Sequence, residues 1–164
     1  NAKDNLSDDD KQILIYFSLL HDYGRDSEDA DDTHGEKAVA KIRRNRTKIK
    51  GINLSKKSRL IAEYLIKYHC LDDKIGENAI NAESKFSRRD KLRVVHLYHI
   101  AKDMDGLDRV RFCGLDYRML RTEFGRKLPL IAGTLLKEQL INLLSEHDFE
   151  ECMQIIAAKK GERT

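Results

Sequence analysis

The sequence predicts an all-α fold, a single helical bundle of about six to eight helices. Apolar residues recur at helical spacing along most of the 164 residues. The chain holds one proline and nine glycines, so long helices can run without interruption. We find no run of alternating β-branched residues of the kind that predicts a strand. We expect one domain over residues 1–164, with a core at about 7–125 and C-terminal helices at 127–160.

The first predicted helix begins after Ser7 and ends near His21. The Ser7 side chain can cap this helix, and the aspartates that follow it lie at the positive end of the helix dipole. Gly24 stands just past the helix end, where a glycine commonly closes a helix. Residues 24–33 are then expected to form an acidic loop.

The second and third predicted helices follow from start and stop signals. Residues 33–36, Thr-His-Gly-Glu, match a capping box, so we expect a helix from there to about Lys50, with Gly51 ending it. A third helix is expected over 55–70, opened by a serine and carrying an apolar stripe. The polar segment 71–84 is expected to be a connecting loop.

The second half of the chain predicts further helices. Residues 87–90 match a helix start, and the helix should continue to about Asp105, with Gly106 breaking or loosening it. The remaining expected helices are a short one within 115–124, a long one over 128–145 and a closing one over 149–160.

Composition indicates a globular protein of the reduced cytoplasm. Hydrophobic residues make up 40% of the chain and charged residues 36%, a balance that excludes disorder. No apolar run approaches the roughly 18 residues of a membrane span, so we expect no membrane partner. Cys70, Cys113 and Cys152 are odd in number and far apart, which favours reduced thiols and argues against a cysteine-type zinc site.

A basic stretch without a single acid extends from Lys37 to Arg59. Such a stretch is usually a solvated helix face. A sharper interpretation is that it attracts an anionic substrate. Nucleic-acid binding is a weaker variant, because no aromatic residue alternates with the basic ones.

Metal-ligand side chains occur at four predicted helix ends: His21 and Asp22, His34, His69, and Asp105. Helical bundles build metal sites from side chains that project off facing helices. Taken singly, a histidine at a helix end is more often a cap or a partner of the helix dipole, and an aspartate is more often a turn residue.

The order of the motifs resembles the HD superfamily of metal-dependent phosphohydrolases. LLHDYGR, THGEKA, LIKYHCLDD and AKDMDGLDRVRF follow one another in that order, and the resemblance covers about residues 11–112. It implies a helical domain that hydrolyses a phosphate ester or diester of a phosphorylated small molecule, with a nucleotide as the expected substrate. It also implies a divalent metal ion, whether Mn, Fe, Ni, Co, Zn or Mg, which would lower the pKa of a water molecule.

The resemblance assigns roles to particular residues. His21 and Asp22 match the doublet that binds metal and serves catalysis, and Asp105 matches the distal aspartate ligand. His34 and His69 match the histidines that hold a second metal in some members. Four basic residues are expected near the substrate phosphate: Arg25, which we also count as catalytic, with Lys102, Arg109 and Arg111.

Several alternatives stay open at this point. Arg109 follows Asp108 and could instead belong to a buried ion pair, and His99 could either orient a ligand or pack against the core. The family pattern begins with a further histidine upstream of the doublet, and none precedes His21 here. Either the chain is cut from a longer one, which the missing initiator Met favours, or its metal site is incomplete.

Two other functions compete with the metal-dependent one. The segment LDRVRFCGLDYRMLR is similar to helical phosphodiesterase domains of bacterial effectors, in which histidines and a glutamate act without metal. The third possibility is a helical binding or regulatory module that has lost catalysis and contacts an acidic partner through Arg43, Arg44 and Arg46.

Overall fold

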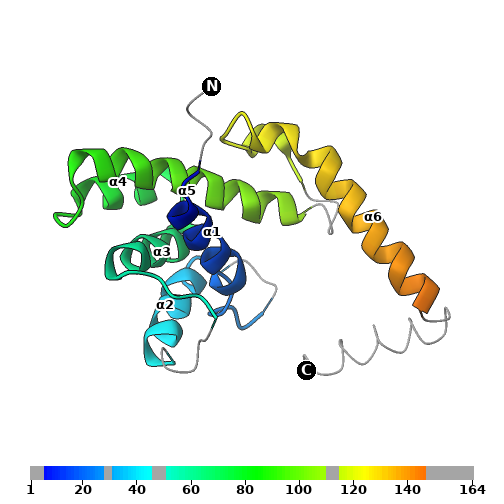
Figure 1. Ribbon diagram of the computed structural model, residues 1–164, viewed down its shortest axis with the longest axis horizontal. Coiled ribbons are helices and arrows are strands. Elements are labelled where there is room, and N and C mark those ends of the chain that lie inside the picture. The colour runs from blue at the N-terminus through cyan, green and yellow to red at the C-terminus, as the bar shows by residue number, and fades with distance from the viewer. Residues whose placement is uncertain (1–5, 28–30, 46–50, 110–114, 147–164) are drawn as a thin grey trace. The chain divides into compact units, whose positions relative to one another are not determined.

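The computed structural model describes residues 6–27, 31–45, 51–109 and 115–146 (Figure 1). These residues form six α-helices and short 3-10 turns, and no strand occurs among them, which confirms the all-α prediction. The chain divides into two compact units, residues 1–105 and 106–164. The division falls earlier than the boundary near residue 125 that the sequence suggested, and the single-domain assignment stays a prediction. The closing helix expected over 149–160 lies outside the described residues.

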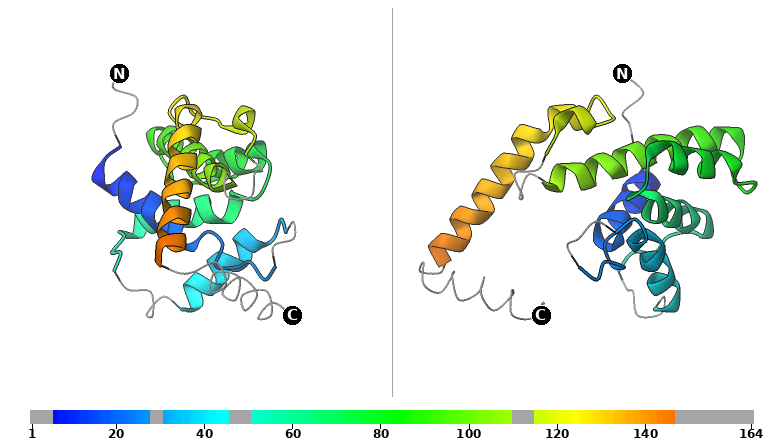
Figure 2. Two further views of the ribbon diagram at one scale, coloured as in Figure 1. Left: turned by 90° about the vertical axis from the view of Figure 1, so that its right-hand side faces the viewer. Right: turned by 180° about the vertical axis from the view of Figure 1, so that it is seen from behind.

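The first unit is built around helix α3, which packs against α1, α2 and α4 (Figure 2). The core between the helices is apolar and fully buried, with Phe17 of α1, Leu65 of α3 and Tyr98 of α5 among its largest side chains. The helices are α1 (Asp8–Leu20), α2 (His34–Arg44), α3 (Lys56–Tyr68), α4 (Asp73–Ala82) and α5 (Arg88–Asp108), the last turn of which enters the second unit.

Side-chain caps start α1 and α3 as the sequence predicted. The Ser7 hydroxyl accepts a hydrogen bond from the Asp10 backbone, and the Asp10 carboxylate accepts one from the Ser7 backbone. The Ser55 hydroxyl likewise accepts from the Ser58 backbone at 3.0 Å. These contacts satisfy backbone N–H groups that a helix start leaves unpaired.

The start and end of α2 differ from the prediction. Thr33 makes no capping hydrogen bond, because its own backbone is already near-helical and its hydroxyl donates to Asp31 at 2.5 Å. The capping-box prediction is therefore wrong, although the helix does begin at His34. It ends at Arg44, earlier than Lys50, because Asn45 leaves the helical conformation.

Helix α4 corrects the loop expected over 71–84. The Asp72 side chain accepts from the Lys74 backbone at 2.9 Å and starts the helix. Its buried face is narrow and consists of Gly76 and Ile80. Gly76 lies against the ring of Tyr98. The segment is polar in sequence, but the cap and the narrow buried face stabilise it as a helix.

Helix α5 also runs further than expected, through Gly106 to Asp108. One glycine costs a helix only about 1 kcal/mol relative to alanine, which a long helix tolerates. The prediction that Gly106 breaks the helix is wrong, and Asp105 lies within the helix rather than after it.

Two glycines allow the helix ends of the first unit to approach closely. A Cβ on Gly24 would lie 2.1 Å from the carbonyl oxygen of His34, and a Cβ on Gly35 would lie 2.5 Å from that of Ile66. Gly24 does not have the positive φ of a helix-closing glycine, so its expected closing role is replaced by this packing role. The contacts bring the end of α1, the start of α2 and the end of α3 together.

The second unit contains the long helix α6 (Pro129–Glu146), which the sequence predicted. The short helix expected within 115–124 is replaced by one 3-10 turn, Tyr117–Met119, and a second 3-10 turn follows at Gly125–Lys127. Among the helices that the structure describes, none combines the length and apolarity needed to cross a membrane.

Candidate metal centre

Five predicted ligand residues of the first unit come together at helix ends. His21 caps the C-terminus of α1 and Asp22 follows it. His34 is the first residue of α2, His69 caps the C-terminus of α3, and Asp105 lies near the end of α5. Residues from four helices thus form one cluster, as the sequence predicted.

Asp22 lies at the middle of the cluster. Its Oδ1 is 3.4 Å from Nε2 of His34 and 3.8 Å from Nε2 of His69. Its Oδ2 is 3.6 Å from Nε2 of His21, and that same nitrogen is 3.6 Å from Oδ1 of Asp105. The Nε2 atoms of His34 and His69 are 2.8 Å apart. Each of the three histidines in the cluster therefore turns its Nε2 toward a carboxylate.

The opposite nitrogen, Nδ1, of each histidine hydrogen-bonds to a backbone carbonyl. A carbonyl oxygen only accepts, so Nδ1 carries the proton and the neutral ring has its lone pair on Nε2. Metal-ligating histidines are oriented in this way. In each case the carbonyl belongs to the residue three positions earlier. Nδ1 is 3.3 Å from the Ser18 oxygen in His21 and 2.7 Å from the Ile66 oxygen in His69, and in His34 it contacts the Asp31 oxygen.

These contacts leave acceptor atoms facing one another in a buried place. His34 and His69 are each 3% exposed, and their Nε2 lone pairs point at one another. Asp22 Oδ1 is also buried and has no hydrogen-bond partner within the described ranges. Such an arrangement is costly unless a proton or a cation lies between the acceptors.

The donor set fits a divalent transition metal. Two ligand atoms bound about 2.1 Å from one ion are roughly 3.0–3.4 Å apart at octahedral or tetrahedral angles. The separations of 2.8, 3.4 and 3.8 Å among Asp22, His34 and His69 bracket this range. Imidazole nitrogen with carboxylate oxygen suits Mn, Fe, Co, Ni or Zn better than Mg, which prefers oxygen alone.

The cluster sets the charges of its own members. The neighbouring His69 imidazole is the largest influence on Asp22 and, with His21 and Arg25, outweighs burial and lowers the Asp22 pKa to about 2. Burial on its own would raise the pKa of Asp105, but His21 and His69 lower it. Burial lowers the pKa of His34. At neutral pH the site therefore offers two carboxylates and a neutral imidazole.

Arg25 lies beside the cluster, as the sequence predicted. Its Nε is 3.4 Å from Asp22 Oδ1, and its side chain is 30% exposed. Its guanidinium thus adds a positive charge between the buried Oδ1 of Asp22 and solvent.

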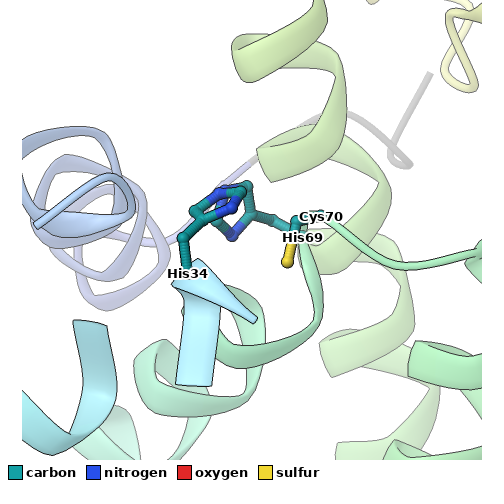
Figure 3. Close-up of side chains that lie close together, drawn as sticks. All are labelled: His34, His69 and Cys70. Carbon is teal, nitrogen blue, oxygen red and sulfur yellow. The ribbon is translucent and has the colours of Figure 1, made fainter. Parts of the chain in front are cut away.

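Cys70 is a further neighbour of the cluster, although the sequence argued against a cysteine-type zinc site. Its Sγ and one ring nitrogen each of His34 and His69 lie within 4.8 Å of one another, and Figure 3 shows the two rings close together with the sulfur below them. The thiol donates to the Asp32 carbonyl at 3.4 Å, and burial raises its pKa. The only sequence signal was its position directly after His69.

The other predicted phosphate-binding residues have different outcomes. Lys102 is 7% exposed, and its ammonium is 2.5 Å from both Asp73 and the Leu71 carbonyl. Arg109 is exposed, which removes the buried ion-pair alternative. It belongs to the second unit, and Arg111 lies outside the described residues.

His99 is neither a ligand nor the partner of one. Its Nε2 is 2.7 Å from Glu77 Oε1, so it links α5 to α4. The contact does not orient a ligand, whereas the partly buried ring beside Tyr98 agrees with the packing interpretation. His96, one turn earlier on α5, is exposed.

No protein-family model matches the chain, and no curated protein or solved structure matches it either. The relation to the HD superfamily therefore stays a prediction. The function of the chain has to be inferred from the geometry of the cluster.

Proposed function

We propose that the protein is a divalent-metal-dependent phosphohydrolase or phosphodiesterase that acts on a phosphorylated small molecule. The observation that carries the proposal is the buried Oδ1 of Asp22, which lacks a hydrogen-bond partner in the described part of the chain and is surrounded by imidazole nitrogens. A nucleotide is the substrate class that we would test first.

Each residue of the cluster has a defined task in this proposal. The ion would be held by Asp22 and by the Nε2 atoms of His21, His34 and His69, and Asp105 would complete the set from α5. The hydrogen bonds from Nδ1 to backbone carbonyls fix the rings before the ion arrives, which lowers the cost of binding. A divalent ion held there would lower the pKa of water and withdraw charge from a phosphate oxygen.

Arg25 would position the substrate. Hydrolysis adds water at phosphorus, breaks the P–O bond to the leaving alcohol and gives that alcohol a proton. Negative charge grows on the phosphoryl oxygens as the bond breaks. A guanidinium next to Asp22, at the solvent boundary, can donate hydrogen bonds to two of these oxygens.

The direct test is hydrolysis of bis(p-nitrophenyl) phosphate and of a nucleotide panel with Mn²⁺ or Ni²⁺. We expect turnover that EDTA removes and that re-added metal restores. His21→Ala and Asp22→Asn should reduce turnover by at least about 10²-fold, a loss typical of removing a metal ligand or its charge. His99→Ala, an imidazole of α5 outside the cluster, should retain activity. Full turnover in Asp22→Asn would contradict the proposal.

A second candidate function is favoured by one contact. The 2.8 Å separation of His34 and His69 is also that of a shared proton, which would suit a metal-independent phosphodiesterase with a general acid–base pair. In that case EDTA leaves turnover unchanged, while His34→Ala or His69→Ala removes it. The EDTA experiment therefore separates the two functions.

A further inference from the structure

We propose that the first turn of α3 and the segment between α4 and α5 form a second anion site, one that binds an oligophosphate. The site goes beyond the proposed hydrolase function and does not depend on it. It gives a role to the basic stretch of the sequence, which the metal centre does not use.

The site is a cavity of about 480 Å³ in the first unit. It is lined by cationic side chains from two parts of the chain, with one apolar and one acidic residue between them: Lys56, Lys57, Arg59, Lys85, Leu60 and Glu63. Lys56 and Lys57 are the first residues of α3, whose first turn has no acid. The positive end of the helix dipole therefore adds to the potential of the side chains.

The lining retains a surplus of positive charge after its ion pairs are counted. Glu63 is already paired with Arg43 at 2.6 Å, and Lys57 is paired with Asp90 at 2.7 Å. Lys56 and Lys85 are exposed and make no ion pair with any residue that the structure describes. Two lysines are thus available at one cavity, and Lys57 and Arg59 lie beside them.

Three cations on α2, namely Lys37, Lys41 and Arg43, are each paired with an acid, which distinguishes them from the two available lysines of the cavity. Lys37 is 2.9 Å from Asp31, and Lys41 is 3.3 Å from Asp26. The acidic segment before α2 therefore offsets the basic residues of α2. Compensation is weaker at the cavity, where Asp90 is the one carboxylate in an ion pair with a lining cation among the residues that the structure describes. The charge of Lys85 also acts on the Glu83 carboxylate, which in turn accepts a hydrogen bond from Tyr64.

The lining indicates the class of ligand. None of the residues lining the cavity is aromatic, so a nucleobase would find no stacking surface there. Several lysines and an arginine around one cavity suit more than one phosphate group. Lys57 and His69 stand at opposite ends of α3, roughly 18 Å apart at 1.5 Å per residue. One phosphate cannot occupy both sites.

The test uses the full chain and inorganic tripolyphosphate in EDTA, so that the metal centre does not contribute. Binding is measured by calorimetry at low and at moderate salt. The double variant Lys56→Glu/Lys85→Glu should weaken binding at least tenfold. The control Lys11→Glu/Lys74→Glu makes the same change in net charge at exposed lysines of α1 and α4, and should change the affinity less than threefold.

Three results would overturn the inference: no binding by the unmodified chain, equal losses in the two double variants, or tighter lysine-dependent binding of an abasic oligonucleotide with the same number of phosphates. The last result would assign the cavity to a nucleic-acid backbone instead. Metal content, measured in parallel without EDTA, should be the same in all variants. A failure of oligophosphate binding is thus distinguishable from a failure of the proposed function.

Discussion

The Nε2 atoms of His34 and His69 lie 2.8 Å apart, although 35 positions separate the two residues in sequence. Both rings donate from Nδ1 to backbone carbonyls, so two nitrogen lone pairs meet in a buried place. A site with this arrangement gains most from a cation that both nitrogens can bind. The packing that creates this contact, and the residues around it, can each be tested by substitution.

The close approach of α2 and α3 depends on Gly35. A methyl group there would lie 2.5 Å and 2.6 Å from the carbonyl oxygens of Ile66 and Lys67, so the helices must separate. We expect Gly35→Ala to destabilise the protein by about 1–3 kcal/mol, the usual cost of overpacking, and to weaken metal binding. Thermal unfolding and calorimetry would measure the two effects.

Gly133→Ala is the matched control for that substitution. Gly133 lies within α6, and a methyl group there meets no atom within 4 Å. Alanine is the better helix former by up to about 1 kcal/mol, so this variant should be as stable as the unmodified protein or more so. An equal loss of stability in the two variants would contradict the packing role of Gly35.

Asp10 should give part of the stability a pH dependence. Burial on its own would raise its pKa, but hydrogen bonds from Ser7 and Arg93 outweigh burial and lower the pKa below 3.8. As the pH falls, the unfolded chain takes up this proton first. The stabilisation is therefore present above about pH 4 and is lost as the pH falls through the lowered pKa.

Asp10→Asn tests this dependence. We expect a loss of about 1–3 kcal/mol at pH 7, typical of a hydrogen-bonded charged group, and a smaller loss near pH 3. Urea unfolding at the two pH values measures the difference. Asp8→Asn is the control, because its side chain is 97% exposed and should contribute less than about 0.5 kcal/mol. A pH-independent effect of Asp10→Asn would count against this role of the carboxylate.

Lys102 should be structural rather than substrate-binding. Its ammonium is 2.5 Å from Asp73 and lies 5.4 Å from the centre of the Tyr98 ring. Lys102→Met removes the ammonium from beside the partly exposed Asp73 carboxylate, and we expect a loss of about 1–3 kcal/mol in urea unfolding. Lys67→Met, which breaks an exposed pair with Glu36, should cost less than about 1 kcal/mol. Unchanged stability of Lys102→Met with a raised KM would reverse the assignment.

Cys70 should not be a ligand at neutral pH. Its thiol donates to a backbone carbonyl, and burial raises its pKa, so it stays protonated while metal binding requires the thiolate. We expect Cys70→Ser to bind Mn²⁺ as the unmodified protein does. Cobalt-loaded protein should lack a sulfur-to-metal charge-transfer band, and its presence would place Cys70 among the ligands.

Sequence patterns predicted the helices that have clear ends and a wide apolar face, namely α1, α3 and α6. Helix α4 was missed because its sequence is polar and contains Gly76, and its stability comes from the Asp72 cap and from contact with Tyr98. Such a contact depends on the position of α5, which local periodicity does not contain.

The ligand residues of the site could be named from motif order, but not the contacts that assemble them. The approach of His34 to His69 requires Gly35, which in sequence looks like part of a capping box. The burial of Lys102 is likewise a result of packing, because a lysine near a ligand motif gives no sign of a partner such as Asp73 on another helix.

The most direct test of the metal centre is the metal content of the purified chain after dialysis against Mn²⁺, Ni²⁺ or Zn²⁺. We predict at least one equivalent of metal for the unmodified protein and for His99→Ala. Asp22→Asn and His69→Ala should retain less than about a tenth of that amount while keeping the helical circular dichroism of the parent. Stoichiometric metal in folded Asp22→Asn, or none in the unmodified protein, would contradict the assignment of a metal centre.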